Sequence, residues 1–485
     1  MKSKIEQQAA FDTIYKGLNP KQQLAVDTIE GPVMVIAGPG TGKTQILGAR
    51  IGKILLDTDT APENILCLTY TDAGAIAMRK RLVSFIGPSA YKVNIATFHS
   101  FCNDIIQDNL SLFDKSNLDP ISELEKIEVL KEVIDAFEKE NPLKRYRGDI
   151  YYEMNNLSKL FSVMKKEGWD AAYIIEKVAQ YIKKIPTKDE FVYKKKYKQF
   201  EAGSLKQAKV DEAMEKMAKL KAAAEAFDSY QSIMKRKSRY DFDDMIVWVL
   251  KAFKEHPSLL AQYQERYLYI LVDEFQDTSG TQNELVSSLV NYWEQPNLFV
   301  VGDDDQSIYR FQGANVENML QIKTKYVNDL IAIVLENNYR SSQPILDTST
   351  NVINNNIGRL VNQIEDLEKK LIASTPENIA NIQVPIVASY NNPQEEMIDI
   401  TEQITYLIQS GVPAKEIAVL SKENKYGEQI AHFLQQKNIP IYTKRTANLF
   451  DEILIQQIIT ILKYLAAEWD QPNEGANLLF EILHY

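Results

Sequence analysis

The sequence predicts an α/β protein with two parallel-sheet domains, the first interrupted by a helical insertion. Short apolar runs alternate with helical patterns on both sides of a long middle segment, and a further alternation begins at residue 331. In the middle segment, between about residues 103 and 237, Glu, Lys, Ala and Leu dominate and strand signals vanish. Such alternation is typical of a parallel sheet covered by helices.

The expected elements follow from apolar runs bounded by turn residues. For the first sheet we expect strands at 33–37, 65–69, 93–98, 269–273 and 298–302. For the second we expect strands at 331–336, 382–387 and 417–420, and helices from 344, at 394–408 and at 426–437. The expected domains are 1–105 with 229–328, the insertion 106–228, and a second α/β domain over 329–485.

Composition narrows the class of protein. The net charge of −11 argues against a protein that coats nucleic acid by bulk charge, although a local basic groove stays possible. Two cysteines cannot build a disulfide framework, and four scattered histidines form no metal-ligand pattern. No apolar run approaches the roughly 20 residues of a membrane span. We therefore expect a cytoplasmic protein whose metal, if any, arrives with a nucleotide.

The stretch AGPGTGKT directly follows the first expected strand. Its glycines allow successive backbone N–H groups to turn inward and surround an anion. Lys43 would reach the β- and γ-phosphates, and the Thr44 hydroxyl would hold Mg²⁺. Ala37 stands where the strict pattern has Gly, and the competing interpretation is an ordinary glycine-rich turn. The candidate nucleotide ligands are Ala37, Gly38, Pro39, Gly40, Thr41, Gly42, Lys43 and Thr44.

Two further segments place polar residues at strand ends. In ILVDEFQDTSGTQ, residues 270–282, Asp273 is the candidate second Mg²⁺ contact and Glu274 the candidate base for the attacking water. A solvated acidic strand end is the alternative. In VGDDDQSIYRFQGA, residues 301–314, Gln306 could sense the γ-phosphate. Tyr309 and Phe311 could stack on bases, although paired aromatic residues also occur in cores.

Several motifs in fixed order carry a family resemblance. They are LNPKQ, AGPGTGKT, TYTDAGAIAMRKR, TFHSFC, DFDDM, VDEFQDT, VGDDDQSIYRFQGA and LENNYRSSQPIL, and they span residues 18–346. This set resembles the UvrD/Rep/PcrA helicases of superfamily 1. The resemblance implies two RecA-like phosphate-loop domains and an ATP-dependent helicase that moves 3′ to 5′ on single-stranded DNA, in repair or replication.

The resemblance also implies roles for single residues. Gln22 would bind the adenine edge, Tyr339 would stack on the adenine ring, and Arg340 would act as an arginine finger. Gln306 would couple hydrolysis to the DNA track. The residues on the family's strand-binding positions are Tyr70, Thr71, Thr97, His99, Tyr309 and Phe311.

The chain departs from the family pattern at several positions. Asp72 and Ala73 replace Asn and Lys, Gln312 replaces an Arg, and Gln45 replaces an Arg or Lys. We therefore expect weaker or more salt-sensitive strand binding than in other members. The basic stretch at 193–198, with Lys206 and Lys209, could grip the duplex at a single-strand/double-strand junction, or could be a solvated helix face.

The end of the chain sets two more expectations. The family's last two motifs, including a second arginine finger, are not found, so we expect an N-terminal portion with an incomplete second domain and poor ATP hydrolysis. Two alternatives stay open: the motor part of a RecB/AddA-like helicase-nuclease, and an ATP-gated DNA-binding module without motor activity.

Overall fold

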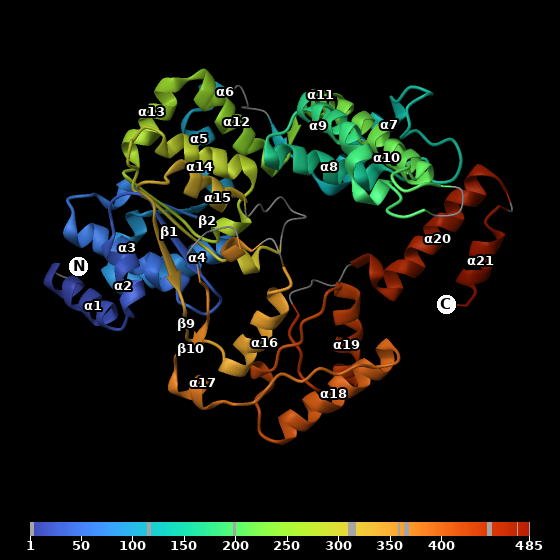
Figure 1. Cartoon of the computed structure of the whole chain (residues 1–485). Coiled ribbons are helices and arrows are strands. Elements are labelled where there is room, and N and C mark those ends of the chain that lie inside the picture. Colours follow the sequence, from blue (N-terminus) through green and yellow to red (C-terminus); the bar gives the residue numbers. More distant parts are fainter. Residues whose placement is uncertain are drawn as a thin grey trace. The chain divides into compact units, whose positions relative to one another are not determined.

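The computed structural model describes residues 4–113, 118–196, 200–308, 317–356, 359–362, 368–443, 449–472 and 474–484. The chain divides into two compact units, Met1–Pro385 and Ile386–Tyr485. Figure 1 shows the course of the chain through its helices and strands. A membrane span would need a longer run of apolar helix than any that the described residues form.

The first unit is built on a six-stranded sheet in the order β3-β2-β6-β7-β1-β8. Its strands are β1 Val33–Ala37, β2 Ile65–Thr69, β3 Asn94–Thr97, β6 Tyr269–Val272, β7 Leu298–Gly302 and β8 Ile331–Leu335. Every neighbouring pair is parallel. The expected positions of the five first-sheet strands are confirmed to within a residue or so, because each is a short apolar run bounded by turn residues.

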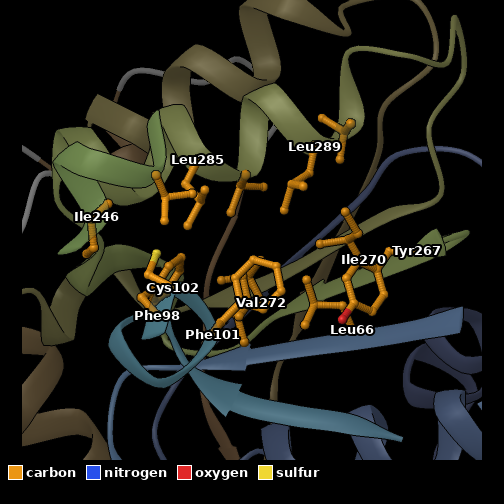
Figure 2. Close-up of a cluster of buried hydrophobic side chains, with 14 of the residues drawn as sticks. Leu66, Phe98, Phe101, Cys102, Ile246, Tyr267, Ile270, Val272, Leu285 and Leu289 are labelled. Atoms are coloured by element: carbon orange, nitrogen blue, oxygen red, sulfur yellow. The ribbon is translucent and has the colours of Figure 1, made fainter. Parts of the chain in front are cut away.

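Alternate side chains of these strands fill two separate cores. In β6, Ile270 and Val272 join one hydrophobic cluster, and Tyr269 and Leu271 join the other. A strand directs successive side chains to opposite faces, so a parallel sheet needs helices on both sides. Figure 2 shows the first cluster, where Leu285 and other helix side chains face Ile270 and Val272 of the sheet.

Helices from distant parts of the chain cover the two faces. One face carries α5 Phe98–Asp108, α12 Phe242–Glu255, α13 Pro257–Arg266, α14 Gly280–Val290 and α15 Glu317–Lys325. The other carries α1 Lys4–Lys16, α2 Pro20–Asp27, α3 Lys43–Asp57 and α4 Asp72–Ile86. The carboxyl ends of all six strands meet at one edge of the sheet, where ligands of such folds bind.

The strand at 331–335 lies in a different sheet from the one we expected. We placed it at the start of a second α/β domain, but β8 pairs in parallel with β1, from Val33 opposite Ile331 to Ala37 opposite Leu335. The reason is that β1 offers a free hydrogen-bonding side, which an apolar strand satisfies. The first sheet therefore extends beyond residue 328.

The middle of the chain forms a helical insertion, as its composition predicts. Its helices are α7 Glu123–Asp135, α8 Met154–Glu167, α9 Ala171–Lys184, α10 Gln207–Glu225 and α11 Phe227–Arg236 (Figure 1). They enclose a hydrophobic core of their own. Tyr230 and Met234 of α11 belong to this core. The insertion therefore extends past residue 228, the boundary expected from the sequence. The short parallel pair β4 Asp119–Pro120 and β5 Arg239–Tyr240 joins its two ends.

After β8 the first unit continues through short elements. They are β9 Asn337–Asn338, α16 Gln343–Ile353, β10 Ile372–Ala373 and α17 Pro376–Ala380, and β10 pairs in parallel with β9. This pair returns the chain to the neighbourhood of the first sheet, next to the glycine-rich loop.

The second unit is helical in its described part. It contains α18 Pro393–Gln409, α19 Asn424–Gln436, α20 Ile453–Asp470 and α21 Ala476–Ile482, and Met397, Ile404, Ile430 and Leu434 form its core. The expected helices at 394–408 and 426–437 are confirmed. The segments 382–387 and 417–420, where we expected strands, have no regular structure. A strand requires a hydrogen-bonded neighbour, and the described chain brings none to either segment.

Candidate nucleotide site

The glycine-rich loop connects β1 to α3 in a conformation that only glycine adopts easily. Gly40 and Gly42 have φ of +69° and +89°. A Cβ on Gly40 would lie 2.6 Å from Cβ of Arg340, and one on Gly42 would lie 2.8 Å from Nε2 of Gln22. The Thr41 hydroxyl donates to the Gly38 carbonyl at 2.8 Å. The loop is therefore tightly turned and packed, with its backbone N–H groups at the positive end of α3.

Gln22 braces this loop from α2. Its side chain and that of Asn19 form a reciprocal capping box at the start of the helix. Its Nε2 also donates to the Thr41 carbonyl at 2.9 Å, and the residue is 2% exposed. The family resemblance implies an adenine contact here. The structure adds a second task, since the same amide connects α2 to the phosphate loop.

Lys43 pairs with Glu274 across the site. Nζ of Lys43 lies 2.6 Å from Oε2 of Glu274, which also accepts from Nε2 of Gln276 at 3.0 Å. Glu274 has a φ of +47°, an uncommon conformation for a residue with a side chain. The two groups that we expected to act on the γ-phosphate and on the water are thus brought into direct contact.

Two further carboxyl groups surround this ion pair. Asp273 directly follows β6 and is buried. Its pKa is raised to about 6, mainly by burial and further by the charge of Glu274. The same two causes raise the pKa of Asp277 to about 6. Oδ1 of Asp277 is buried without a hydrogen-bond partner in the described structure. Lys43 is the cation that lowers both values.

This arrangement fits a magnesium ion. Thr44, in the first turn of α3, is partly exposed, and its hydroxyl makes no hydrogen bond within the described residues. Hydroxyl and carboxylate oxygens are the ligands that Mg²⁺ prefers. A cation beside Thr44 and Asp273 would also stabilise the ionised form of the Asp273 carboxyl, whose pKa is raised by burial and then by the charge of Glu274.

Tyr339 and Arg340 approach the loop from the segment after β8. The Tyr339 N–H donates to the Gly40 carbonyl at 2.9 Å, and its hydroxyl accepts from Nδ2 of Asn19 at 2.8 Å. Tyr339 as a whole is 39% exposed. Arg340 is exposed, and within the described part of the chain its guanidinium pairs with no carboxylate. Asn338 donates to the Pro39 carbonyl, which joins this segment directly to the loop.

Gln306 is connected to the same site. Its Nε2 donates to Oδ2 of Asp303 at 2.6 Å, and the Asp303 N–H donates to Oε1 of Gln276 at 2.9 Å. Gln276 in turn contacts Glu274. Gln276 and Asp277 lie in the segment 270–282, for which the sequence predicts roles only at Asp273 and Glu274. The available signal was a run of polar residues directly after a buried strand.

Four of the six expected strand-binding residues are described, and they lie at or directly after the carboxyl ends of β2 and β3. Thr71 and Thr97 cap the first turns of α4 and α5. Their hydroxyl oxygens accept from the backbone N–H groups of Gly74 and Ser100. Nε2 of His99 lies 3.6 Å from Oδ1 of Asp243. Tyr70 follows β2 and is partly exposed. Tyr309 and Phe311, like Gln312, lie outside the described residues.

The basic stretch at 193–198 is largely compensated by local acceptors. Lys194 pairs with Asp189 at 2.6 Å, Lys196 pairs with Glu201, and Lys206 donates to the Glu190 carbonyl at 3.2 Å. Residues 197 and 198 lie outside the described chain. A grip on duplex DNA at this place stays a prediction.

Two family models together match most of the chain. Residues 18–327 match the family described as UvrD/REP helicase N-terminal domain, and residues 333–473 match the UvrD-like helicase C-terminal domain. An ATP-dependent DNA helicase PcrA of Bacillus subtilis is 32% identical over 347 residues, 71% of this chain and 40% of that protein. A putative ATP-dependent DNA helicase YjcD of the same organism is 30% identical over 471 residues, 95% of this chain and 53% of that protein.

A probable DNA helicase II homolog of Rickettsia felis is 28% identical over 476 residues, 92% of this chain and 62% of that protein. The chain therefore spans about half the length of the relatives it matches. Our expectation that it holds only an N-terminal portion is wrong, because the match continues through the C-terminal domain of the family.

Proposed function

Because the chain belongs to the UvrD/REP helicase family, we propose that it is the ATP-hydrolysing motor of a DNA helicase. The observation that carries the proposal is the Lys43–Glu274 ion pair at 2.6 Å, formed beside the glycine-rich loop and opposite Tyr339 and Arg340. A phosphate-binding cation and a base for water, held in contact, are what hydrolysis of a phosphoanhydride requires.

ATP binding would exchange the partners of this pair. The γ-phosphate would take Lys43 from Glu274, and the released carboxylate would orient a water and accept its proton. Arg340, free of an ion pair among the described residues, would reach the γ-phosphate as negative charge develops in the transition state. The exposed ring of Tyr339 would stack on the adenine, whose edge Gln22 would meet.

Thr44 and Asp273 would hold Mg²⁺ with the nucleotide, and the ion would neutralise phosphate charge. The raised pKa of Asp273, caused by burial and then by the charge of Glu274, supports this assignment because a bound cation would compensate the charge of the ionised carboxylate.

The proposed track for single-stranded DNA follows the carboxyl edge of the sheet. Tyr70, Thr71, Thr97 and His99 lie there, and Tyr309 and Phe311 belong to the same proposal. Movement from 3′ to 5′, preference for single-strand/double-strand junctions and a role in repair or replication rest on the family. The two domains would close around ATP and open after hydrolysis, and this cycle would move the protein along the strand.

The alternatives differ in what they predict. A helicase-nuclease would add a nuclease activity to the same motor. A binding module without motor activity is disfavoured because Lys43, Glu274, Gln306 and Arg340 are all present and the first three belong to one hydrogen-bond network.

ATP hydrolysis with and without single-stranded DNA tests the proposal. We expect slow phosphate release by the full chain that DNA stimulates, and a rate lower by about 100-fold or more in Lys43→Ala, because one group that stabilises transition-state charge is removed. Lys53→Ala is the matched control, since Lys53 lies on the same helix and pairs with Asp27 and Asp57 at the surface. The proposal fails if the wild-type rate ignores DNA or if Lys43→Ala keeps it.

A further inference from the structure

We propose that Lys369 is a positioning residue for ATP hydrolysis, which holds the turn at Asp303–Asp305 so that Gln306 and Glu274 keep their orientation. The inference rests on the function proposed above. Its starting observation is that the Lys369 side chain is only 2% exposed although it carries a charge. A buried ammonium group is found where carboxylates compensate it.

Lys369 contacts three consecutive carboxylates. Its Nζ pairs with Asp303, lies 3.0 Å from Oδ1 of Asp304 and 2.8 Å from Oδ2 of Asp305. The side chains of Asp303 and Asp304 are fully buried. Carboxylates so close together repel one another, so without the ammonium group this turn could not keep its compact form.

A second cation, Arg359, also binds the turn. The guanidinium of Arg359 grips Asp305 with two nitrogen atoms, Nε at 2.7 Å and Nη2 at 2.8 Å. The Leu360 N–H donates to Oδ2 of Asp304 at 2.7 Å. The acidic turn is therefore clamped by residues that follow α16, far along the chain from the turn.

The clamped turn is continuous with the reacting groups. Asp303 accepts from Nε2 of Gln306 through Oδ2, and its backbone N–H donates to Gln276. Gln276 donates to Glu274 at 3.0 Å, and Glu274 contacts Lys43. Lys369 thus stands at the outer end of a network whose inner end is the phosphate-binding lysine.

The segment that carries Lys369 also touches the phosphate loop. Cδ2 of Leu371 lies 2.6 Å from the place where a Cβ on Gly38 would stand. The next residues form β10 and pair with Asn337 and Asn338 of β9, and Asn338 contacts the loop carbonyl of Pro39. One short segment therefore contacts both the loop that would bind the phosphates and the turn that orients Gln306.

The test compares Lys369→Met, Lys369→Arg and the neighbouring control Lys370→Met in DNA-stimulated ATP hydrolysis by the full chain. Methionine keeps much of the side-chain volume and removes the charge, whereas Lys370 is exposed. We expect kcat to fall about 10- to 100-fold in Lys369→Met, because misplacement of reacting groups by a fraction of an ångström to an ångström has this effect. Lys369→Arg should recover much of the rate, and Lys370→Met should match wild type.

Binding of a fluorescent ATP analogue separates positioning from a merely structural role. We expect its Kd in Lys369→Met to stay within about twofold of wild type, because the phosphate loop and Tyr339 are untouched. If Lys369→Met unfolds, Lys369→Met with Asp304→Asn removes one repelling charge and should fold while staying slow.

Two results would overturn the inference: an unchanged kcat in a Lys369 variant that lacks the charge, or a fall in kcat matched by an equal loss of ATP binding. The proposed function is judged separately, by the wild-type rate against Lys43→Ala. The inference is judged by the ratio of Lys369→Met to wild type, so it can fail while the proposed function stands.

Discussion

At the scale of single residues, the conformation of Glu274 is the most informative detail of the site. Its φ of +47° costs about 1–3 kcal/mol and persists only where surrounding contacts over-determine it. Those contacts are present: its N–H donates to Asp273 at 3.0 Å, and its carboxylate meets Lys43 and Gln276. The Glu274 carboxylate, on a strained backbone and held between a cation and an amide, is poised to change partners when phosphate arrives.

Asp277 allows a prediction about pH. Its folded pKa is raised to about 6, first by burial and then by the charge of Glu274. The folded state therefore binds the proton more tightly than the unfolded state does. The stability that this provides is complete below the unfolded pKa near 4 and is lost as pH rises through 6. We expect Asp277→Asn to raise the free energy of unfolding at pH 8 by on the order of 1 kcal/mol, with little effect at pH 4.

Thermal or urea unfolding at the two pH values measures this effect. The control is Asp59→Asn, because Asp59 is an exposed carboxylate. A gain that is equal at both pH values would show that the buried charge of Asp277 is not its cause.

At the scale of elements, the joint between α8 and α12 connects the helical insertion to the sheet domain. Nζ of Lys165 lies 2.7 Å from Asp241 and 2.8 Å from Asp244, beneath the ring of Tyr230. Asp241 and Asp244 also form the capping box that begins α12. One buried lysine thus neutralises the two carboxylates that start a helix of the neighbouring core.

We expect Lys165→Ala to lower the free energy of unfolding by about 3–5 kcal/mol, because it leaves buried carboxylates without their cation. Urea titration of the full chain measures the loss. Lys159→Ala on the exposed side of the same helix should change stability by no more than about 0.5 kcal/mol. Equal effects of the two variants would refute this account of the joint.

Apolar runs predict some strands of this protein correctly and others wrongly. The strands β1, β2 and β7 lie where the apolar runs predict them, because their boundaries are local turn residues. The segments 382–387 and 417–420 carry the same kind of pattern, yet they have no strand. Their composition satisfies the pattern, but a strand also needs hydrogen bonds from a neighbour that local sequence does not specify.

At the scale of the whole molecule, the parallel sheet brings motifs from distant parts of the chain to one edge. The net charge is −11, and acidic residues near this edge would repel a DNA strand. Asp72 lies in the first turn of α4, where the helix dipole favours a carboxylate. The same carboxylate follows Tyr70 and Thr71 and would face the phosphates of a bound strand. We expect Asp72→Asn to tighten binding of single-stranded DNA about two- to fivefold at low salt, since one repulsive charge is removed.

Filter binding over a range of salt concentrations measures this affinity. Asp59→Asn is the control, because Asp59 lies between α3 and β2, at the opposite edge of the parallel sheet. The gain for Asp72→Asn should shrink at high salt as charges are screened. An equal gain for both variants would point to net charge and not to the position of Asp72.

The sequence by itself determined the nucleotide loop, the strand-end carboxylates and the order of the motifs, because each depends on residues within a few positions of one another. Tertiary structure alone decided that β8 completes the first sheet, that Gln22 braces the loop, and that Lys369 clamps the turn at Asp303. These contacts join residues far apart along the chain, and the energy that selects them comes from burial and charge compensation. The residues next to Lys369 in the sequence do not indicate which carboxylates it contacts, because those carboxylates lie far away along the chain.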